Sequence, residues 1–333
     1  MPHKFVSMQR ADRGKVSAPH PVMLAIAGDS AAGKTTLTKG LAEALGPDRV
    51  TAVCVDDYHA YDREERRTLP FTPLNPACNY VDIMEQHLQL LATGQPILKP
   101  VYHHSSGTLG RPELVRPSEF VIVEGLLPLH TKLARACFDV TVYLDTPEEI
   151  RRGWKVRRDC AKRGYTPEQV LADLERREPE SAAFIRPQRR HADIVVRFAP
   201  VEEVGSEAPL SATIMLRATI PHPDLSSVLT ADTRRALHLK LVRDDDAKPV
   251  DALHVHGHSP RALSREVEDH VWASLGVATD LPAGRGAVEP GVRSEPLAIT
   301  QLVLLFHLLQ VAHSDSLAGG PAHAGVPAAA SRP

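Results

Sequence analysis

Two adjacent carboxylates follow a short apolar run. Residues 50–55 (VTAVCV) have the β-branched, apolar character of a buried strand, and Asp56 and Asp57 come directly after them. Aspartate disfavours strand interiors, and α/β sheets bind their ligands at the carboxyl ends of strands. A carboxylate at such a position can take the proton from an alcohol, as the general base of a kinase does. A loop that simply opens with Asp-Asp is the alternative interpretation.

A phosphate-binding motif lies upstream of this pair. The stretch GDSAAGKTT matches G-x-x-x-x-G-K-[ST] between an apolar run and a helical pattern, which is the context that the motif requires. Its glycines let backbone N–H groups and a helix N-terminus face phosphate oxygens, while Lys34 reaches the β- and γ-phosphates. The residues predicted to bind ATP are Gly28, Asp29, Ser30, Ala31, Ala32, Gly33, Lys34, Thr35 and Thr36. No N-K-x-D element accompanies them, which disfavours a guanine-specific GTPase.

A magnesium site is expected beside this motif. The Thr35 hydroxyl is the usual P-loop ligand of Mg²⁺, and a carboxylate at the end of a neighbouring strand normally accompanies it. Glu124, which ends the apolar run FVIVE, is suitably placed. A carboxylate that merely caps the next element is the alternative.

A strongly basic helix is predicted after Pro147. Arg151, Lys155, Arg158 and Lys162 are spaced so that they share one face, and Asp159 can pair with Arg163. So much positive charge in a near-neutral chain favours an anionic ligand over a merely solvated face. A second phosphorylated ligand besides ATP would also explain further basic residues, namely Arg176, Arg177, Arg186, Arg189 and Arg190.

The elements that must position these residues alternate between strands and helices. Apolar runs predict strands over residues 22–28, 50–55, 120–125 and 139–145, and a helical pattern separates the first two. This order predicts an α/β fold of the P-loop NTPase type, with a mixed, mainly parallel sheet flanked by helices. Residues 94–118 are rich in Pro, Gly, Ser and His, and we expect them to form a long loop.

The chain divides into four expected regions. Residues 1–20 should form a flexible arm, 21–200 the P-loop kinase core, 201–313 an α+β extension with exposed antiparallel strands, and 314–333 a disordered tail. The apolar stretch 302–312 is interrupted by His307 and Gln310 and is shorter than a membrane span needs.

Composition excludes several classes of protein. The chain has 333 residues, a net charge of −2 and a pI near 6.8, so neither nucleic acid nor an acidic membrane is an expected partner. Its four cysteines lack metal-ligand spacing, which fits a reducing, cytoplasmic location. The alternating histidines His254, His256 and His258 are better explained by a strand that runs into a turn than by a metal site.

The ordered series of these motifs resembles the phosphoribulokinase branch of the phosphoribulokinase/uridine kinase family, and is most similar to its plant and cyanobacterial type. The resemblance covers residues 22–197 and is more specific than the P-loop alone. It rests on the stretches VDDYHAYDR, LNPACNYVDIM, KPVYHHSSG, VIVEGLLPLH, WKVRRDCAKRGYTPEQV and FIRPQRRHAD.

This resemblance implies a reaction. A cytoplasmic homodimer would use ATP and Mg²⁺ to phosphorylate O1 of D-ribulose 5-phosphate, giving D-ribulose 1,5-bisphosphate and ADP, a Calvin cycle-type step. Asp56 would be the catalytic base, Lys34 and Asp159 further catalytic residues, and Thr35 and Glu124 the metal ligands. The implied substrate contacts are His59, Arg63, Tyr102, His104, Lys155, Arg158 and Arg163. Arg176 and Arg177 match a pair assigned to nucleotide or effector binding.

The sequence departs from the plant type at its cysteines. That type has a cysteine just before the second P-loop glycine, which pairs with one just before the DDYH acids. Here Cys54 is kept, but Ala32 occupies the first position, and no cysteine follows Cys160. The resemblance therefore does not extend to a thioredoxin-operated disulfide switch.

Two other functions remain open from the sequence. A uridine-type kinase of the same family is disfavoured because its acceptor is a neutral nucleoside, whereas this sequence concentrates positive charge. A P-loop regulator without kinase activity is disfavoured because the candidate catalytic residues are all present, and a degenerate protein is free to lose several of them.

Overall fold

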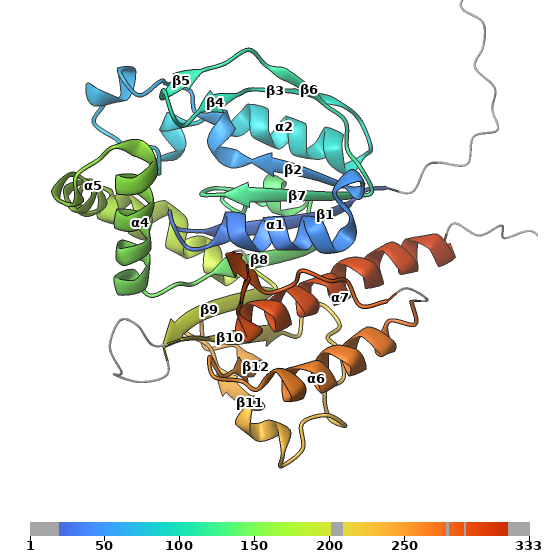
Figure 1. Cartoon of the computed structure of the whole chain (residues 1–333). Helices are drawn as coiled ribbons and strands as arrows, with labels where there is room; N and C mark the ends of the chain where they lie inside the picture. Colours follow the sequence, from blue (N-terminus) through green and yellow to red (C-terminus); the bar gives the residue numbers. More distant parts are fainter. Residues whose placement is uncertain (1–19, 201–208, 278–279, 290, 319–333) are drawn as a thin grey trace, which may run out of the picture.

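One eight-stranded sheet runs through the residues that the computed structural model describes, which are 20–200, 209–277, 280–289 and 291–318 (Figure 1). The strands are β1 (Val22–Gly28), β2 (Val50–Cys54), β7 (Phe120–Gly125), β8 (Val140–Leu144), β9 (Ile194–Pro200), β10 (Leu210–Arg217), β11 (Leu237–Arg243) and β12 (Pro249–Val255). Their order is β11-β12-β10-β9-β8-β1-β7-β2. The five strands from β2 to β9 are parallel, and β10, β12 and β11 continue the sheet in antiparallel pairing. The predicted fold class is confirmed.

The four predicted strands are four of the five parallel strands of this sheet, with β2 at its edge. Every residue of β1 is buried, as its uninterrupted apolar sequence indicates for a strand covered on both faces. The sequence does not single out β9, although it too is apolar. It predicts exposed strands at β10 and β11. This is wrong for β10, which lies between β9 and β12 and is largely buried, and right for most of β11 at the sheet edge.

Helices cover both faces of the sheet. Side chains of α1 (Lys34–Leu45), α6 (Arg261–Ser274) and α7 (Glu295–Ala318) share one apolar core with β1, β10 and β12. The opposite core contains α2 (Val81–Ala92) and α3 (Lys132–Arg135), which pack on the other face of β1, β2 and β7. The C-terminal helices thus complete the same layer as the helix that follows the P-loop.

Helix α7 is a core helix. It is long and apolar enough to cross a membrane by length and composition, but 72% of its apolar window is buried inside the protein. Its polar His307 is buried, where it contacts the Val303 carbonyl oxygen at 2.6 Å and the ring of His222 at 2.9 Å. The helix runs to Ala318, past the expected start of the tail at residue 314. Residues 1–19 and 319–333, which include the expected arm and the end of that tail, lie outside the described residues.

Two capped helices stand at the carboxyl end of the parallel strands (Figure 1). Helix α4 (Glu148–Arg163) has two glutamates in its first turn and ends at Gly164, whose φ of 71° is left-handed. Helix α5 (Pro167–Glu180) begins with a capping box between Thr166 and Gln169. These signals fix where the two helices begin and end.

The expected long loop over residues 94–118 contains two short antiparallel ladders instead, one nested inside the other. Strands β3 (Ile97–Lys99) and β6 (Glu113–Val115) pair with each other, and β4 (Tyr102–His103) pairs with β5 (Thr108–Leu109). The prediction is wrong because strands of two or three residues are too short to show an alternating pattern. A further hairpin, β13 (Ala287–Glu289) with β14 (Val292–Arg293), precedes α7.

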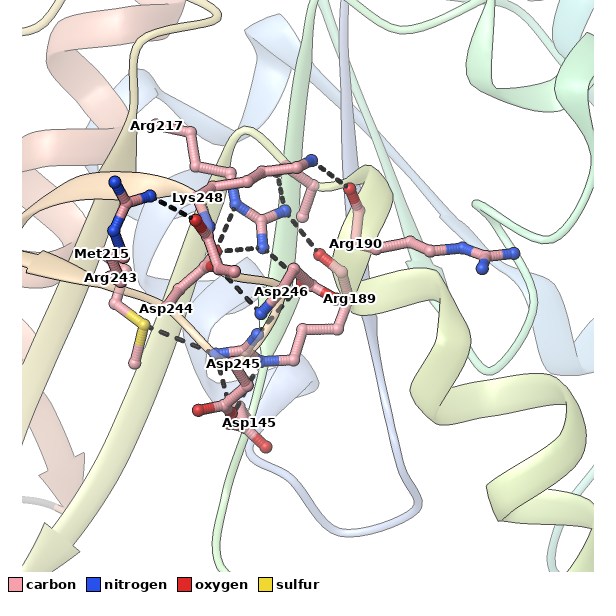
Figure 2. A network of polar contacts seen from close by, with 12 residues as sticks. Asp145, Arg189, Arg190, Met215, Arg217, Arg243, Asp244, Asp245, Asp246 and Lys248 are labelled. Carbon is pink, nitrogen blue, oxygen red and sulfur yellow. Dashed lines mark hydrogen bonds and ion pairs between the residues drawn. The ribbon is translucent and has the colours of Figure 1, made fainter.

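A buried ion network joins the antiparallel strands to the core (Figure 2). Arg217, at the end of β10, donates from Nε to Asp244 at 2.9 Å and from Nη2 to Asp246 at 2.8 Å. Its Nη1 donates to the backbone carbonyl oxygens of Arg189 and Ala192, both at 2.8 Å. The side chains of Arg217 and Asp244 are 2% and 0% exposed, so this pair is shielded from water.

Candidate active site

The P-loop has the geometry that phosphate binding requires. Gly28 has a φ of 151°, and a Cβ there would approach the Leu144 carbonyl oxygen to 2.8 Å, so glycine is needed. Helix α1 begins at Lys34. The Lys34 ammonium donates to the carbonyl oxygens of Gly28 and Asp29, each at 2.8 Å, which holds it over the loop. The strand–loop–helix context of the motif is therefore present.

The two expected metal ligands are in contact. The Thr35 hydroxyl donates to Oε1 of Glu124 at 2.8 Å, although the residues lie on α1 and β7. Burial raises the pKa of Glu124, and the Lys34 ammonium opposes that effect. An all-oxygen pair beside a phosphate-binding loop fits Mg²⁺, which prefers oxygen ligands and is usually held by one or two protein groups.

The two aspartates that follow β2 have different surroundings. Asp57 pairs with the Lys99 ammonium and accepts a 3.0 Å hydrogen bond from the backbone N–H of Tyr102, so it anchors the hairpin segment. Among the described residues, by contrast, Oδ1 of Asp56 is buried without a hydrogen-bond partner. Asp56 is therefore the member of the pair whose carboxylate is free to accept a proton.

Neighbouring cationic groups keep Asp56 ionised. Burial is the largest influence on its pKa and acts to raise it. The opposing charges outweigh burial, so the pKa of Asp56 lies below its ordinary value. These charges belong to His59, His104, Lys34 and Arg163.

The expected acceptor contacts from the first half of the chain converge beside Asp56. The Tyr102 ring packs edge-on against His59 and against His104, at centroid distances of 4.9 and 5.1 Å. Nδ1 of His59 contacts Oδ1 of Asn79 at 2.7 Å, and Arg63 donates to the His104 carbonyl oxygen at 2.6 Å. Burial lowers the pKa of both histidines, and the Asp56 carboxylate acts in the opposite direction.

Asp159 is enclosed by cations. Arg158 donates to it at 2.8 Å, and Lys155 and Arg163 lie 3.5 Å from its carboxylate oxygens. Lys155 also pairs with Asp173 at 3.0 Å. Burial acts to raise the pKa of Asp159, but these cations lower it overall. The carboxylate thus fixes three cations in place and is not free to act as a base.

These groups line one cavity of about 470 Å³ that touches the P-loop at Ser30. Eight of the lining residues are Arg or Lys and three are Asp, which leaves a strong excess of positive charge. The eight are Arg63, Arg66, Arg67, Lys155, Arg158, Arg163, Arg176 and Arg177. All seven expected substrate contacts lie here, together with Asp56 and Asp159.

Several lining residues are not predicted from the sequence. They are Arg66, Arg67, Phe71, Tyr165, Gln169 and Asp173. Arg66 lies over the Tyr102 ring at 4.8 Å and donates to the Tyr61 carbonyl oxygen at 3.1 Å. The run EERR in an otherwise irregular segment was the available signal. No local pattern shows that this segment folds over the pocket.

Three basic residues that were considered for the ligand have structural partners instead. Arg151 lies 4.0 Å from Asp29 of the P-loop, Arg186 pairs with Glu178, and Arg189 belongs to the buried ion network. None of the three lines the cavity. Helical spacing showed which residues share a face, but it could not show which of them meet a carboxylate.

Cys54 lies beside Asp56 and Glu124, and its pKa is raised well above the ordinary value by burial and by these two carboxylates. Because only the thiolate is a good nucleophile, we expect iodoacetamide to label Cys54 at least ~10-fold more slowly in the folded protein than in urea at the same pH. Site-resolved mass spectrometry measures both rates, with half-exposed Cys160 as internal reference. Equal rates for Cys54 in the two states would contradict this expectation.

Residues 23–205 match the model of the Phosphoribulokinase / Uridine kinase family. The chain is 41% identical over 179 residues to a phosphoribulokinase of Synechocystis sp., and 34% identical over 208 residues to the chloroplastic phosphoribulokinase of Spinacia oleracea. These alignments cover 54% and 57% of this chain and 54% and 52% of the relatives, so the chain spans about half the length of both.

A uridine kinase of Oceanobacillus iheyensis is 32% identical over 184 residues, which are 53% of this chain and 86% of that enzyme. The fold is similar to the solved structure of a phosphoribulokinase from Rhodobacter spheroides. That likeness has a TM-score of 0.55 at 16% identity and covers 75% of this chain and 94% of the other. With the family model matched over more than half of its residues, the chain belongs to the phosphoribulokinase/uridine kinase family.

Proposed function

We propose that this protein transfers the γ-phosphoryl group of ATP to O1 of D-ribulose 5-phosphate, which yields D-ribulose 1,5-bisphosphate and ADP. The excess of eight Arg and Lys side chains over three Asp in the cavity is the observation that carries the proposal. A sugar phosphate brings two negative charges that need such partners, whereas the ribose of uridine brings none. The phosphoribulokinase relatives support the same choice.

The proposed roles follow from the surroundings of each residue. Asp56, ionised and unpartnered at Oδ1 among the described residues, takes the proton of the attacking hydroxyl. Lys34 neutralises charge on the transferred phosphoryl group. His59, Arg63, Tyr102 and His104 hold the acceptor from one side, and Lys155, Arg158 and Arg163 hold its phosphate from the other. Arg176 and Arg177, anchored on Asp173, lie at the cavity wall and add to its positive field.

Thr35 and Glu124 would hold Mg²⁺, which when bound neutralises the phosphate charges of ATP. Asp159 acts as a positioning residue in this scheme. Its three cations are arranged before the substrate arrives, so little reorganisation accompanies binding.

An ADP-release assay with Mg²⁺-ATP tests this function by comparing D-ribulose 5-phosphate with uridine as acceptor. We expect turnover with the sugar phosphate and none with uridine. Turnover with uridine alone would overturn the assignment of the cationic pocket to an acceptor phosphate. Binding of ATP without turnover on either acceptor would favour a regulator that lacks kinase activity.

We also propose that residues 21–200 carry the chemistry, and that residues 201–313 complete the sheet and a homodimer interface. Edge strand β11 exposes Leu239 and Leu241, the latter 76% exposed, along a backbone edge with which no other described strand pairs. An edge strand can pair with its own copy about a twofold axis.

We expect Leu241→Lys to shift the protein from dimer to monomer in light scattering after size exclusion. Lys240→Glu, at the neighbouring position, is the control. A wild-type monomer would contradict the proposal.

The proposed location is the cytoplasm. Cys54, Cys78, Cys137 and Cys160 are all free thiols, as expected in a reducing compartment.

A further inference from the structure

Three side chains with metal-binding atoms meet beside the reaction centre. Cys54 ends β2, Asp56 lies in the 3-10 helix Val55–Tyr58 that follows, and His104 lies in the turn between β4 and β5. Their ligand atoms, a thiol sulfur, a carboxylate oxygen and a ring nitrogen, all lie within 4.8 Å of one another. Across the ranges that the structure describes, no other three His, Cys, Asp or Glu residues meet in this way.

The donor set is different from that of the Mg²⁺ site. Thr35 and Glu124 offer only oxygen, whereas this group combines sulfur, nitrogen and oxygen. Mg²⁺ avoids thiolate, but Zn²⁺ and Co²⁺ bind thiolate, imidazole and carboxylate together. Three protein ligands with a fourth position left for a solvent or substrate atom is the arrangement of an open zinc site.

The distances allow such a site after a small adjustment. Tetrahedral bonds of about 2.0–2.3 Å place ligand atoms about 3.5 Å apart. Nε2 of His104 lies 3.9 Å from Oδ2 of Asp56 already, and the full group spans up to 4.8 Å. The His104 side chain is 41% exposed at the cavity, so it has room to rotate toward the other two ligands.

The charged groups around the site have opposing effects on the binding of a dication. The carboxylates of Asp56 and Glu124 lie beside the Cys54 thiol and favour a dication. Lys34 and Arg163 also lie near Asp56 and oppose it. The sulfur ligand therefore determines which metal ion binds. It adds affinity for a thiophilic cation and none for a hard cation such as Mg²⁺.

We propose that Cys54, Asp56 and His104 bind a thiophilic divalent cation of the zinc class, and that this cation inhibits the enzyme by occupying Asp56. The binding follows from the three ligands alone, whereas the inhibition rests on the proposed function, in which Asp56 is the base. Metal binding displaces the thiol proton to solvent, and the carboxylate that should receive the acceptor proton becomes a ligand.

Co²⁺ is a spectroscopic probe for the binding itself. We expect the full chain to bind one Co²⁺ with a near-ultraviolet thiolate-to-cobalt charge-transfer band, in the presence of excess Mg²⁺, and Zn²⁺ to abolish that band. Cys54→Ser should lack the band and bind Co²⁺ at least ~10-fold more weakly, since even outer partners of metal ligands contribute that much. Cys160→Ser, at another half-exposed cysteine, is the matched control and should retain it.

The second readout is inhibition. Zn²⁺ should inhibit phosphorylation of D-ribulose 5-phosphate, and Cys54→Ser should need at least ~10-fold more Zn²⁺ while its uninhibited turnover matches the wild type. Absence of the charge-transfer band in the wild type, or its persistence in Cys54→Ser, would overturn the site. Binding without inhibition would overturn the proposed effect on Asp56.

If Cys54→Ser fails to fold, the variant His104→Gln tests the metal site instead. It should retain the sulfur band, change the visible cobalt spectrum and weaken binding, whereas an unchanged spectrum would remove His104 from the site. If the enzyme does not phosphorylate the sugar phosphate at all, the cobalt spectra still show whether the metal site exists. Failure of the metal site and failure of the proposed function are therefore distinguishable.

Discussion

Asp56→Asn should lower kcat for phosphorylation of D-ribulose 5-phosphate by ~10² to 10⁴, the usual contribution of a general base. The substitution preserves shape but removes the proton acceptor, whose Oδ1 makes no hydrogen bond among the described residues. The affinity for ATP should change little, because Lys34 and Thr35 remain in place. Initial rates at saturating Mg²⁺-ATP, with ATP binding measured by calorimetry, separate the two effects.

Asp57→Asn is the informative control for that experiment. Asp57 holds Lys99 and the Tyr102 backbone, so its loss should lower the thermal midpoint and raise KM for the acceptor. Its kcat should remain well above that of Asp56→Asn. If Asp57→Asn lowers kcat by ~10² or more while Asp56→Asn retains nearly full turnover, the assignment of the base is wrong.

Arg217→Met should lower the free energy of unfolding by about 3–5 kcal/mol, the range for removing one partner of a buried ion pair. It leaves the Asp244 carboxylate, 0% exposed, without its arginine (Figure 2), and it removes the guanidinium donor from the carbonyl oxygens of Arg189 and Ala192. Urea denaturation followed by circular dichroism measures the change.

Two variants isolate the cause of that loss. Arg197→Met removes an arginine whose side chain is 44% exposed and which lies 3.5 Å from Asp145, and it should change stability by less than about 1 kcal/mol. Adding Asp244→Leu to Arg217→Met removes the stranded charge and should restore part of the stability. If the double variant is the least stable of all, the unpaired Asp244 carboxylate is not the cause of the stability lost in Arg217→Met.

The kinase core could be predicted from the sequence because its signals are local. The buried strands β1, β7 and β8 are unbroken apolar runs between turn residues, and the motif at Gly28 to Thr35 fixes the loop between β1 and α1. The caps of α4 and α5 likewise lie within a few residues of the helices that they end or begin.

The remainder depends on contacts between distant segments. Arg66 lines the cavity because residues 56–80 fold back over Tyr102, and no spacing along the chain encodes that path. The separate roles of Asp56 and Asp57 follow from Lys99, more than forty residues away. The motif resemblance placed Asp159 at the site but did not indicate that three cations enclose it.

The unbroken sheet has a consequence for how the molecule opens. Strand β9 pairs in parallel with β8 and antiparallel with β10, and α7 packs against both β1 and β10, so no hinge separates the described parts of the core and the extension. Amide protons of β8 and β10 should therefore exchange with deuterium through a single cooperative opening. ATP bound at the P-loop should slow exchange in β10 as well as in β8, although β10 contributes no residue to the cavity.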